Sequence, residues 1–227
     1  MRSLSLVIPV YGSGSGSMLR RILGHVSMLK DAAAESGFVL VEVIVVDDGS
    51  PQPIDAVTEC GIPEGVALSV LRNERNRGKG YSVRRGALAA KGRWVLMSDV
   101  DESVPLTEFA ALARIVDGNA IICGIRCGRS DSRPLHRRVL SWLFSLVNGT
   151  GLRDSQCGFK LFDMAEMRTA FERLRTERFA FDVELIRAAP SVAAVPVKWR
   201  GRKRSSLKVW RDAPRMLWDL MLMRFRR

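Results

Sequence analysis

Short apolar runs alternate with segments of helical periodicity along the first half of the chain. The apolar runs have the length and β-branched composition of buried strands, whereas the segments between them repeat apolar residues every three or four positions. The predicted strands are Leu4–Val10, Val39–Val46, Ala67–Leu71, Trp94–Ser98 and Ala120–Ile125, and the predicted helices are Ser17–Ser36, Tyr81–Lys91 and one that begins near Pro105. Strands that alternate with helices in this order predict an α/β fold with a mainly parallel sheet flanked by helices.

The second half of the chain has a less regular pattern. Its further predicted elements are a strand at Gly158–Phe162, a helix at Phe181–Ala189 and a strand at Val192–Trp199. Leu135–Val147 and Pro214–Phe225 are also predicted to be helices, the second with Asp212 as its cap and Pro214 in its first turn. The sequence has no internal repeat and no interdomain linker, so we expect a single domain over residues 1–227.

Composition indicates a globular protein of the cytoplasm. Hydrophobic residues make up 47% of the chain and charged residues 26%, which is ordinary for a folded domain. No apolar run approaches the roughly 20 residues of a membrane-spanning helix, and the first strand begins where a secretory signal would stand. The 4 cysteines form no CxxC pair, so we expect free thiols in a reducing compartment.

Positive charge is concentrated in the second half of the chain. Residues 1–110 contain 12 Lys and Arg against 13 Asp and Glu, whereas residues 111–227 contain 24 against 11. A basic half implies an anionic partner, which charge alone leaves open among nucleic acid, anionic lipid and phosphate. The sequence has no helix-turn-helix, zinc or RNP pattern, so we expect no nucleic acid.

The last segment, Trp210–Arg227, combines tryptophans and aliphatic residues with arginines. This composition is typical of an amphipathic helix that lies in a membrane surface. A core-packed helix with a basic outer face would have the same composition, so both interpretations stay open.

Polar residues stand at the carboxyl ends of three predicted strands. They are Tyr11, the pair Asp47 and Asp48, and the Asp99-Val-Asp101 turn. Ligands of open α/β sheets bind beyond this edge. Two carboxylates on one turn are suited to share Mg²⁺ or Mn²⁺, although a solvated turn has the same pattern.

Two glycine-rich segments fail the standard nucleotide-binding patterns. Gly12–Ser17 has serine at the position of the third glycine of the dinucleotide fingerprint, and Asn76–Gly80 lacks the Ser or Thr of a Walker loop. The second segment either presents backbone N–H groups and Lys79 to a diphosphate or simply starts a helix. No nucleophile elbow is present, so nothing supports hydrolase chemistry.

Taken together, these motifs resemble the family 2 glycosyltransferases in their order and spacing. The matching motifs are Val7–Tyr11, Val45–Ser50, Asn76–Gly80, Arg84–Gly86 and Met97–Asp101. Further on, Asp154–Phe162 and Arg178–Leu185 resemble the dolichyl-phosphate glucosyltransferase branch, and more weakly the mannose synthases. The resemblance covers about Leu4 to Trp210. It implies a GT-A fold and transfer of a sugar, most simply glucose from UDP-glucose, to a polyprenyl phosphate.

The resemblance also implies roles for individual residues. The residues that it assigns to the nucleotide-sugar site are Pro9, Tyr11, Asp47, Asp48, Lys79 and Asp99. It assigns the metal site for Mg²⁺ or Mn²⁺ to Asp99 and Asp101, and catalytic roles to Asp101 and Asp154. The acceptor phosphate would be held by Arg126, Arg137 and Ser141. Residues 1–110 would then bind the donor and residues 111–227 the acceptor. The family usually has an Asn-Glu-Glu-like run after the tyrosine, which Gly12–Ser17 replaces here.

A phosphate acceptor suits this charge distribution. A phosphate monoester is largely ionised at pH 7, so it attacks without a general base and needs arginines to position it. In-line attack inverts the anomeric centre. Because a lipid phosphate lies at a bilayer, we expect peripheral attachment to the cytoplasmic membrane face. The alternatives are another donor, such as GDP-mannose or a UDP-amino sugar, a non-lipid acceptor, and a non-catalytic basic binding protein.

Overall fold

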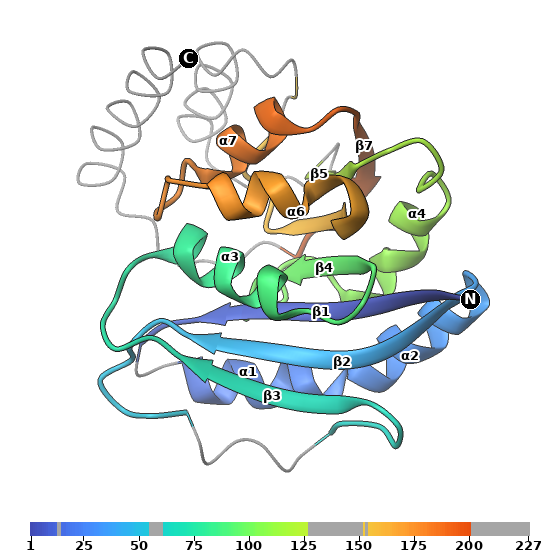
Figure 1. The fold of residues 1–227 in the computed structure, drawn as a ribbon. Coiled ribbons are helices and arrows are strands. Elements are labelled where there is room, and N and C mark those ends of the chain that lie inside the picture. Colours follow the sequence, from blue (N-terminus) through green and yellow to red (C-terminus); the bar gives the residue numbers. More distant parts are fainter. Residues whose placement is uncertain (13–14, 55–60, 127–151, 153, 201–227) are drawn as a thin grey trace.

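The protein is built around one mixed seven-stranded sheet (Figure 1). The structure, a computed structural model, describes residues 1–12, 15–54, 61–126, 152 and 154–200. The strands are β1 (Arg2–Val10), β2 (Phe38–Asp47), β3 (Ala67–Arg72), β4 (Trp94–Ser98), β5 (Ile121–Arg126), β6 (Phe159–Asp163) and β7 (Val192–Val197). The helices are α1 (Ser15–Gly24), α2 (Val26–Glu35), α3 (Lys79–Ala89), the 3₁₀ turn η2 (Leu106–Glu108), α4 (Phe109–Ala113), α6 (Met164–Arg173) and α7 (Phe181–Ala188).

The strand order is β3-β2-β1-β4-β6-β5-β7. Strands β1, β2, β3 and β4 pair in parallel, as do β5 and β7, whereas β6 is antiparallel to both β4 and β5. Because β6 reverses direction between them, the carboxyl ends of β4 and β5 lie at the same edge of the sheet. The predicted mainly parallel α/β fold is therefore confirmed, with one antiparallel strand.

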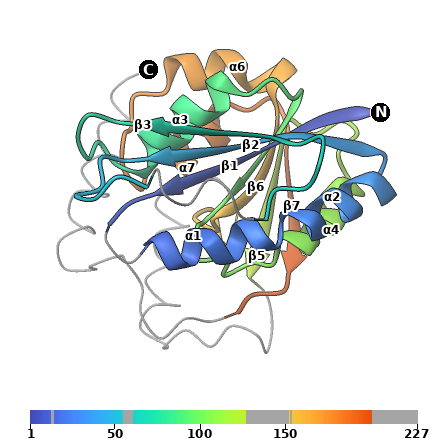
Figure 2. The ribbon, with the colours of Figure 1, turned by 90° about the horizontal axis from the view of Figure 1, so that it is seen from below.

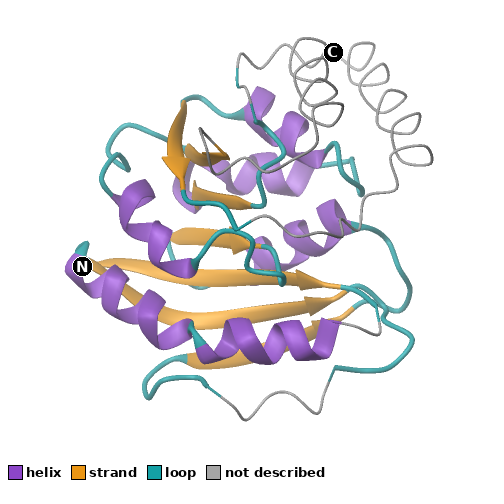
Figure 3. Ribbon diagram, turned by 180° about the vertical axis from the view of Figure 1, so that it is seen from behind, coloured by secondary structure: helices purple, strands orange, loops and turns teal. Residues whose placement is uncertain are grey.

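Helices cover both faces of the sheet, as the views in Figures 2 and 3 show. On one face, apolar side chains of α1, α2 and α4 pack with alternate residues of β1 and β2, such as Leu6 and Val43. On the other face, α3, α6 and α7 pack against the intervening residues, such as Val7 and Ile44. Both faces are buried, which explains why these strands are almost continuously apolar in sequence.

The segment predicted as one helix over Ser17–Ser36 forms two helices, so this prediction was wrong. The break falls at Gly24 and His25, between α1 and α2. Glycine is a poor helix former, and it has no side chain to obstruct a neighbour. A Cβ built on Gly61 would lie 2.8 Å from the Gly24 Cα, so residue 61 packs directly against this break.

Helix α6 was not predicted, although its sequence carries the expected signals. The Asp163 side chain caps it by accepting a hydrogen bond from the Ala165 N–H. Met164, Met167 and Phe171 are buried at helical spacing. The helix follows β6 without a loop, so its first residues read as a continuation of the strand.

Other predicted helices lie outside the described residues. These are Leu135–Val147 and Pro214–Phe225, of which the second includes most of the expected membrane-surface segment. Among the residues that the structure describes, no helix has the length and apolar character needed to cross a membrane.

Candidate active site

The predicted site residues lie along one edge of the sheet. Tyr11 follows β1, Asp47 ends β2, Asp99 follows β4 and Arg126 ends β5. The chain passes from β1 outward to β2 and β3 and then returns to β4 on the other side of β1. In α/β proteins ligands bind at the carboxyl ends of the strands beside such a reversal of strand order, which here are β1 and β4.

Asp47 and Asp48 are both buried and both bonded to protein groups. Arg72 Nη1 donates to Asp47 Oδ2 at 2.5 Å, and the Ser50 N–H donates to Asp47 Oδ1 at 2.9 Å. Asp48 accepts from Asn73 Nδ2 at 2.8 Å. Asp47 and Asp48 thus fix the turn after β2 and the beginning of the loop that follows β3.

Asp48 also holds the start of α3. Its Oδ1 accepts the Arg77 N–H at 3.0 Å and its Oδ2 accepts the Gly78 N–H at 2.8 Å. Gly78 has φ 109°, a conformation that favours glycine, and a Cβ there would lie 2.6 Å from the Glu177 carbonyl oxygen. The Asn76–Gly80 segment is thus a helix-initiating turn that a protein carboxylate already occupies.

Lys79, the first residue of α3, reaches toward the metal-binding motif predicted after β4. Its Nζ lies 2.6 Å from Asp99 Oδ1, and both side chains are partly exposed. The Asp99 N–H donates to the Gly158 carbonyl oxygen at 3.1 Å. A Cβ at position 158 would lie 1.9 Å from Asp99 Oδ2, so any other residue there would require this carboxylate to move.

Asp101 completes the predicted motif. Its Oδ1 accepts the Ser103 N–H at 3.0 Å, and its carbonyl oxygen accepts a hydrogen bond from Arg21 at 2.7 Å. Within the described residues no group of three or more His, Cys, Asp or Glu side chains is arranged to hold a metal ion. Two carboxylates nevertheless fit Mg²⁺ or Mn²⁺, because such ions often take one or two carboxylates and fill the other positions with phosphates and water.

Arg126 and Asp154 form a close ion pair beyond the end of β5. Arg126 Nε and Nη2 each donate to one Asp154 oxygen at 2.6 Å, and the Arg126 N–H donates to Oδ2 at 3.1 Å. Burial lowers the pKa of Arg126, but the hydrogen bonds to Asp154 together with the negative charges of Asp154 and its neighbours more than offset this and raise the pKa above its usual value. The guanidinium also lies 5.7 Å from the centre of the Trp199 ring. It is a permanently charged donor held in one orientation.

A second buried ion pair was not predicted. Lys160, the second residue of β6, is 1% exposed, and its Nζ lies 2.7 Å from Asp182 Oδ1 on α7. Burial raises the pKa of Asp182. Burial lowers the pKa of Lys160, but the neighbouring groups, of which Asp182 acts most strongly, together outweigh it and raise this pKa. A sequence signal was present for Lys160, which lies between Phe159 and Leu161, since a charged residue in such a position is buried only when paired.

The electrostatic influence of these groups extends across the site. The charges of Lys79 and Asp99 affect the pKa of Asp182, and the charge of Asp99 affects that of Arg126. Cations and carboxylates therefore alternate from the start of α3 to the end of β5.

The thiols of Cys123 and Cys157 lie near this network, and burial raises their pKa values to about 12 and about 11. They are neutral at pH 7 and not nucleophilic.

The structure brings eight of the eleven predicted site residues to this edge: Tyr11, Asp47, Asp48, Lys79, Asp99, Asp101, Arg126 and Asp154. Tyr11 is 55% exposed there, whereas Pro9 is buried within β1. Arg137 and Ser141, predicted to hold the acceptor phosphate, lie outside the described residues.

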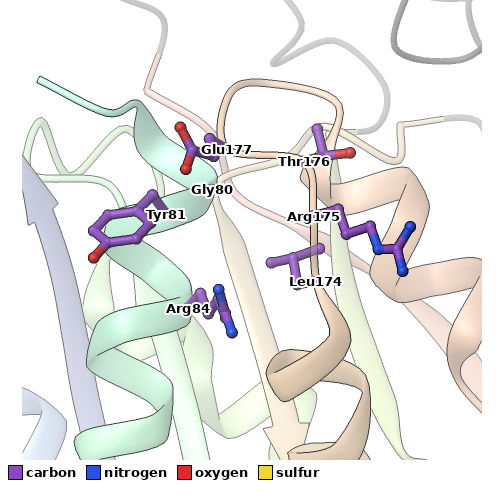
Figure 4. A pocket seen from close by; sticks show the side chains of 7 residues that line it. All are labelled: Gly80, Tyr81, Arg84, Leu174, Arg175, Thr176 and Glu177. Atoms are coloured by element: carbon purple, nitrogen blue, oxygen red, sulfur yellow. The ribbon is translucent and has the colours of Figure 1, made fainter. Parts of the chain in front are cut away.

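A cavity of about 240 Å³ adjoins α3 but is separate from the predicted site (Figure 4). It is lined by Gly80, Tyr81, Arg84 and the segment 174–177. Arg84 donates to the carbonyl oxygens of Phe171 and Glu172, at the end of α6. These contacts fasten α3 to α6, and none of the predicted site residues lines the cavity.

Comparison with known proteins identifies a family and several relatives. The model of the family described as glycosyl transferase family 2 matches residues 5–175. The dolichyl-phosphate beta-glucosyltransferase of Dictyostelium discoideum is 31% identical over 98% of this chain and 74% of its own length. The human protein of the same name is 30% identical over 99% of this chain and 76% of its own length.

Solved structures are similar in fold at lower identity. Glucosyl-3-phosphoglycerate synthase of Mycobacterium tuberculosis is 18% identical, with a TM-score of 0.69 over 98% of this chain and 80% of that one. Another structure of that enzyme contains Mn²⁺, UDP-glucose and phosphoglyceric acid and is 17% identical, with a TM-score of 0.66 over 98% of this chain and 79% of that one. At this identity the likeness concerns the fold.

Proposed function

The chain belongs to glycosyltransferase family 2, and from this premise we propose that it transfers glucose from UDP-glucose to the phosphate of a polyprenyl lipid such as dolichyl phosphate. The observation that carries the proposal is the similarity, at 30–31% identity over nearly the whole chain, to two dolichyl-phosphate beta-glucosyltransferases. The arrangement of carboxylates and arginines at the sheet edge supports it.

The donor would bind at the carboxyl ends of β1 and β4. Pro9 and Tyr11 lie at the end of β1, and the buried Asp47 and Asp48 set the shape of the neighbouring turn. Asp99 and Asp101 would hold Mg²⁺ or Mn²⁺. When bound, such an ion neutralises the negative charge that develops on a nucleoside diphosphate leaving group.

Lys79 is placed to act on the same leaving group. Its ammonium lies 2.6 Å from Asp99, so it already stands beside the predicted metal site. A lysine in this position donates hydrogen bonds to diphosphate oxygens and offsets their charge. The first turn of α3 would serve to position this side chain, because Asp48 occupies the backbone N–H groups of Arg77 and Gly78.

The acceptor would lie on the side of β5. Two of the five N–H donors of Arg126 are directed to Asp154, which leaves donors on the same rigid group for a phosphate. Asp154 would thus act by orienting Arg126. Arg137 and Ser141 remain predicted partners of the same phosphate.

The reaction needs no general base. An oxygen of the ionised acceptor phosphate attacks C1 of glucose and forms the new C–O bond, while the bond from C1 to UDP breaks and UDP leaves with the electron pair. No proton has to be removed. Attack from the face opposite the leaving group converts an α-linked donor into a β-linked product.

If the acceptor is a lipid, the transfer reaction takes place at the surface of a bilayer. We propose peripheral attachment to the cytoplasmic face of a membrane, with the basic half of the chain near anionic lipid. The excess of positive charge in residues 111–227 supports this orientation.

A turnover assay with a matrix of substrates tests the proposal. Radiolabelled UDP-glucose, GDP-mannose and UDP-N-acetylglucosamine are each combined with a short polyprenyl phosphate, with 3-phosphoglycerate or with no acceptor. We expect label in the organic phase only with UDP-glucose and polyprenyl phosphate. Faster transfer from GDP-mannose would contradict UDP-glucose as the donor. Transfer to 3-phosphoglycerate at a rate equal to that with polyprenyl phosphate would contradict a lipid as the acceptor.

A further inference from the structure

The residue after Asp101 has an unusual backbone conformation. Glu102 has φ 50°, and among the described residues it is the non-glycine residue with positive φ. Such a conformation is unfavourable for a long side chain and persists only where surrounding contacts impose it. The Glu102 side chain is also 6% exposed, although glutamate usually lies in solvent.

Arg21, in the last turn of α1, and His25, at the break between α1 and α2, face the Glu102 carboxylate. His25 Nδ1 lies 2.9 Å from Oε1 and 2.8 Å from Oε2. A carboxylate only accepts hydrogen bonds, so Nδ1 carries the hydrogen and donates. Arg21 Nε lies 4.0 Å from Oε2 and adds a second positive group.

Three further hydrogen bonds fix the chain around Asp101. Arg21 Nη2 donates to the Asp101 carbonyl oxygen at 2.7 Å, while the Glu102 N–H donates to the Asp99 carbonyl oxygen at 2.9 Å. The Ser103 N–H donates to Asp101 Oδ1 at 3.0 Å. The turn is therefore held by hydrogen bonds within it and by Arg21 and His25, which precede their partners by 80 and 77 residues in sequence.

We propose that Glu102 is a positioning residue, which with Arg21 and His25 holds Asp101 in the geometry that binds a divalent cation. The proposal rests on the proposed function for the presence of that cation. Metal ligands bind tightly when neighbouring groups fix them in advance, and loss of such a neighbour typically weakens metal binding about 10–100-fold. Because α1 follows shortly after Tyr11, the contacts of Arg21 and His25 also connect the predicted metal-binding turn to the part of the chain proposed to bind the donor.

The test compares substitutions that separate these contacts from the backbone strain. Glu102→Gly removes the carboxylate but accommodates positive φ, so we expect it to fold at least as well as the wild type. Glu102→Gln keeps an acceptor for His25 and loses the charge. Glu35→Gln, at the exposed end of α2, is the control.

Mn²⁺ binding in the presence of UDP, read from the electron paramagnetic resonance signal of free Mn²⁺, gives a measurement independent of turnover. We expect the dissociation constant to rise about tenfold or more in Glu102→Gly, by less in Glu102→Gln, and not in the control. Added Mn²⁺ should restore the rate of transfer, with the thermal midpoint unchanged. A folded Glu102→Gly variant with wild-type Mn²⁺ affinity would overturn the proposal.

Failure of the proposed function would look different. A wild-type protein that binds Mn²⁺ and UDP but transfers no glucose to polyprenyl phosphate would contradict the proposed function, while the loss of Mn²⁺ affinity in Glu102→Gly would still support the positioning role.

Discussion

Among the site residues, Asp101 is the one whose substitution is expected to reduce the proposed transfer activity most directly. Asp101→Asn keeps the size of the side chain and removes one negative metal ligand. Because a bound divalent ion supplies several kcal/mol of charge stabilisation, we expect transfer to fall about 100-fold or more without loss of folding. Initial rates over a range of Mn²⁺ concentrations measure this effect.

The matched control is Asp117→Asn, since Asp117 is an exposed carboxylate that pairs with Arg2 away from the site. Equal losses in both variants, or an unchanged Mn²⁺ dependence in Asp101→Asn, would remove Asp101 from the metal site.

Sequence patterns predicted the positions of the site residues better than their partners. Strand ends placed Tyr11, Asp47 and Asp99 at one edge, because parallel strands bring their carboxyl ends together. The pairing of Lys79 with Asp99, and of Arg126 with Asp154, depends on side-chain reach across distant loops. Periodicity carries no information on such pairs, so only the three-dimensional structure reveals them.

At the scale of elements, the strands were predicted well and the helices less so. Buried parallel strands are continuous apolar runs whose limits are clear in sequence. The break between α1 and α2 depends on the close approach of Gly61 to Gly24, which is a tertiary contact. Helix α6 shows the opposite case, since its cap at Asp163 and its buried methionines were visible in sequence and were overlooked.

The Lys160–Asp182 pair joins β6 to α7 inside the molecule, and it provides a test at this scale. Lys160→Met alone leaves an unpaired buried carboxylate, so we expect the free energy of unfolding to fall by about 3–5 kcal/mol. Replacement of both residues, Lys160→Met with Asp182→Leu, should recover most of that loss. Urea denaturation of the wild type and the variants measures both values. A double variant as unstable as the single one would show that packing, and not the unpaired charge, causes the loss.

At the scale of the whole molecule, the asymmetry of charge predicts a preferred contact with anionic membranes. Each basic residue near an anionic surface contributes about 1 kcal/mol, so replacement of Arg224, Arg226 and Arg227 by glutamine should weaken binding by about 3 kcal/mol, or ~100-fold. Co-sedimentation with phosphatidylserine vesicles at low and high salt measures this, with neutral vesicles as the control. Equal recovery of both proteins in the supernatant at low salt would contradict membrane attachment.

The identity and configuration of the product test the central claim most directly. UDP-glucose labelled with ¹³C at C1 is incubated with the protein, Mn²⁺ and a short polyprenyl phosphate, and the reaction is followed by ¹³C and ³¹P NMR. The account predicts that the α-linked C1 signal is replaced by that of a β-linked phosphodiester, with one UDP released for each product molecule. An α-linked product, release of free glucose, or UDP formation without a new phosphodiester would contradict it.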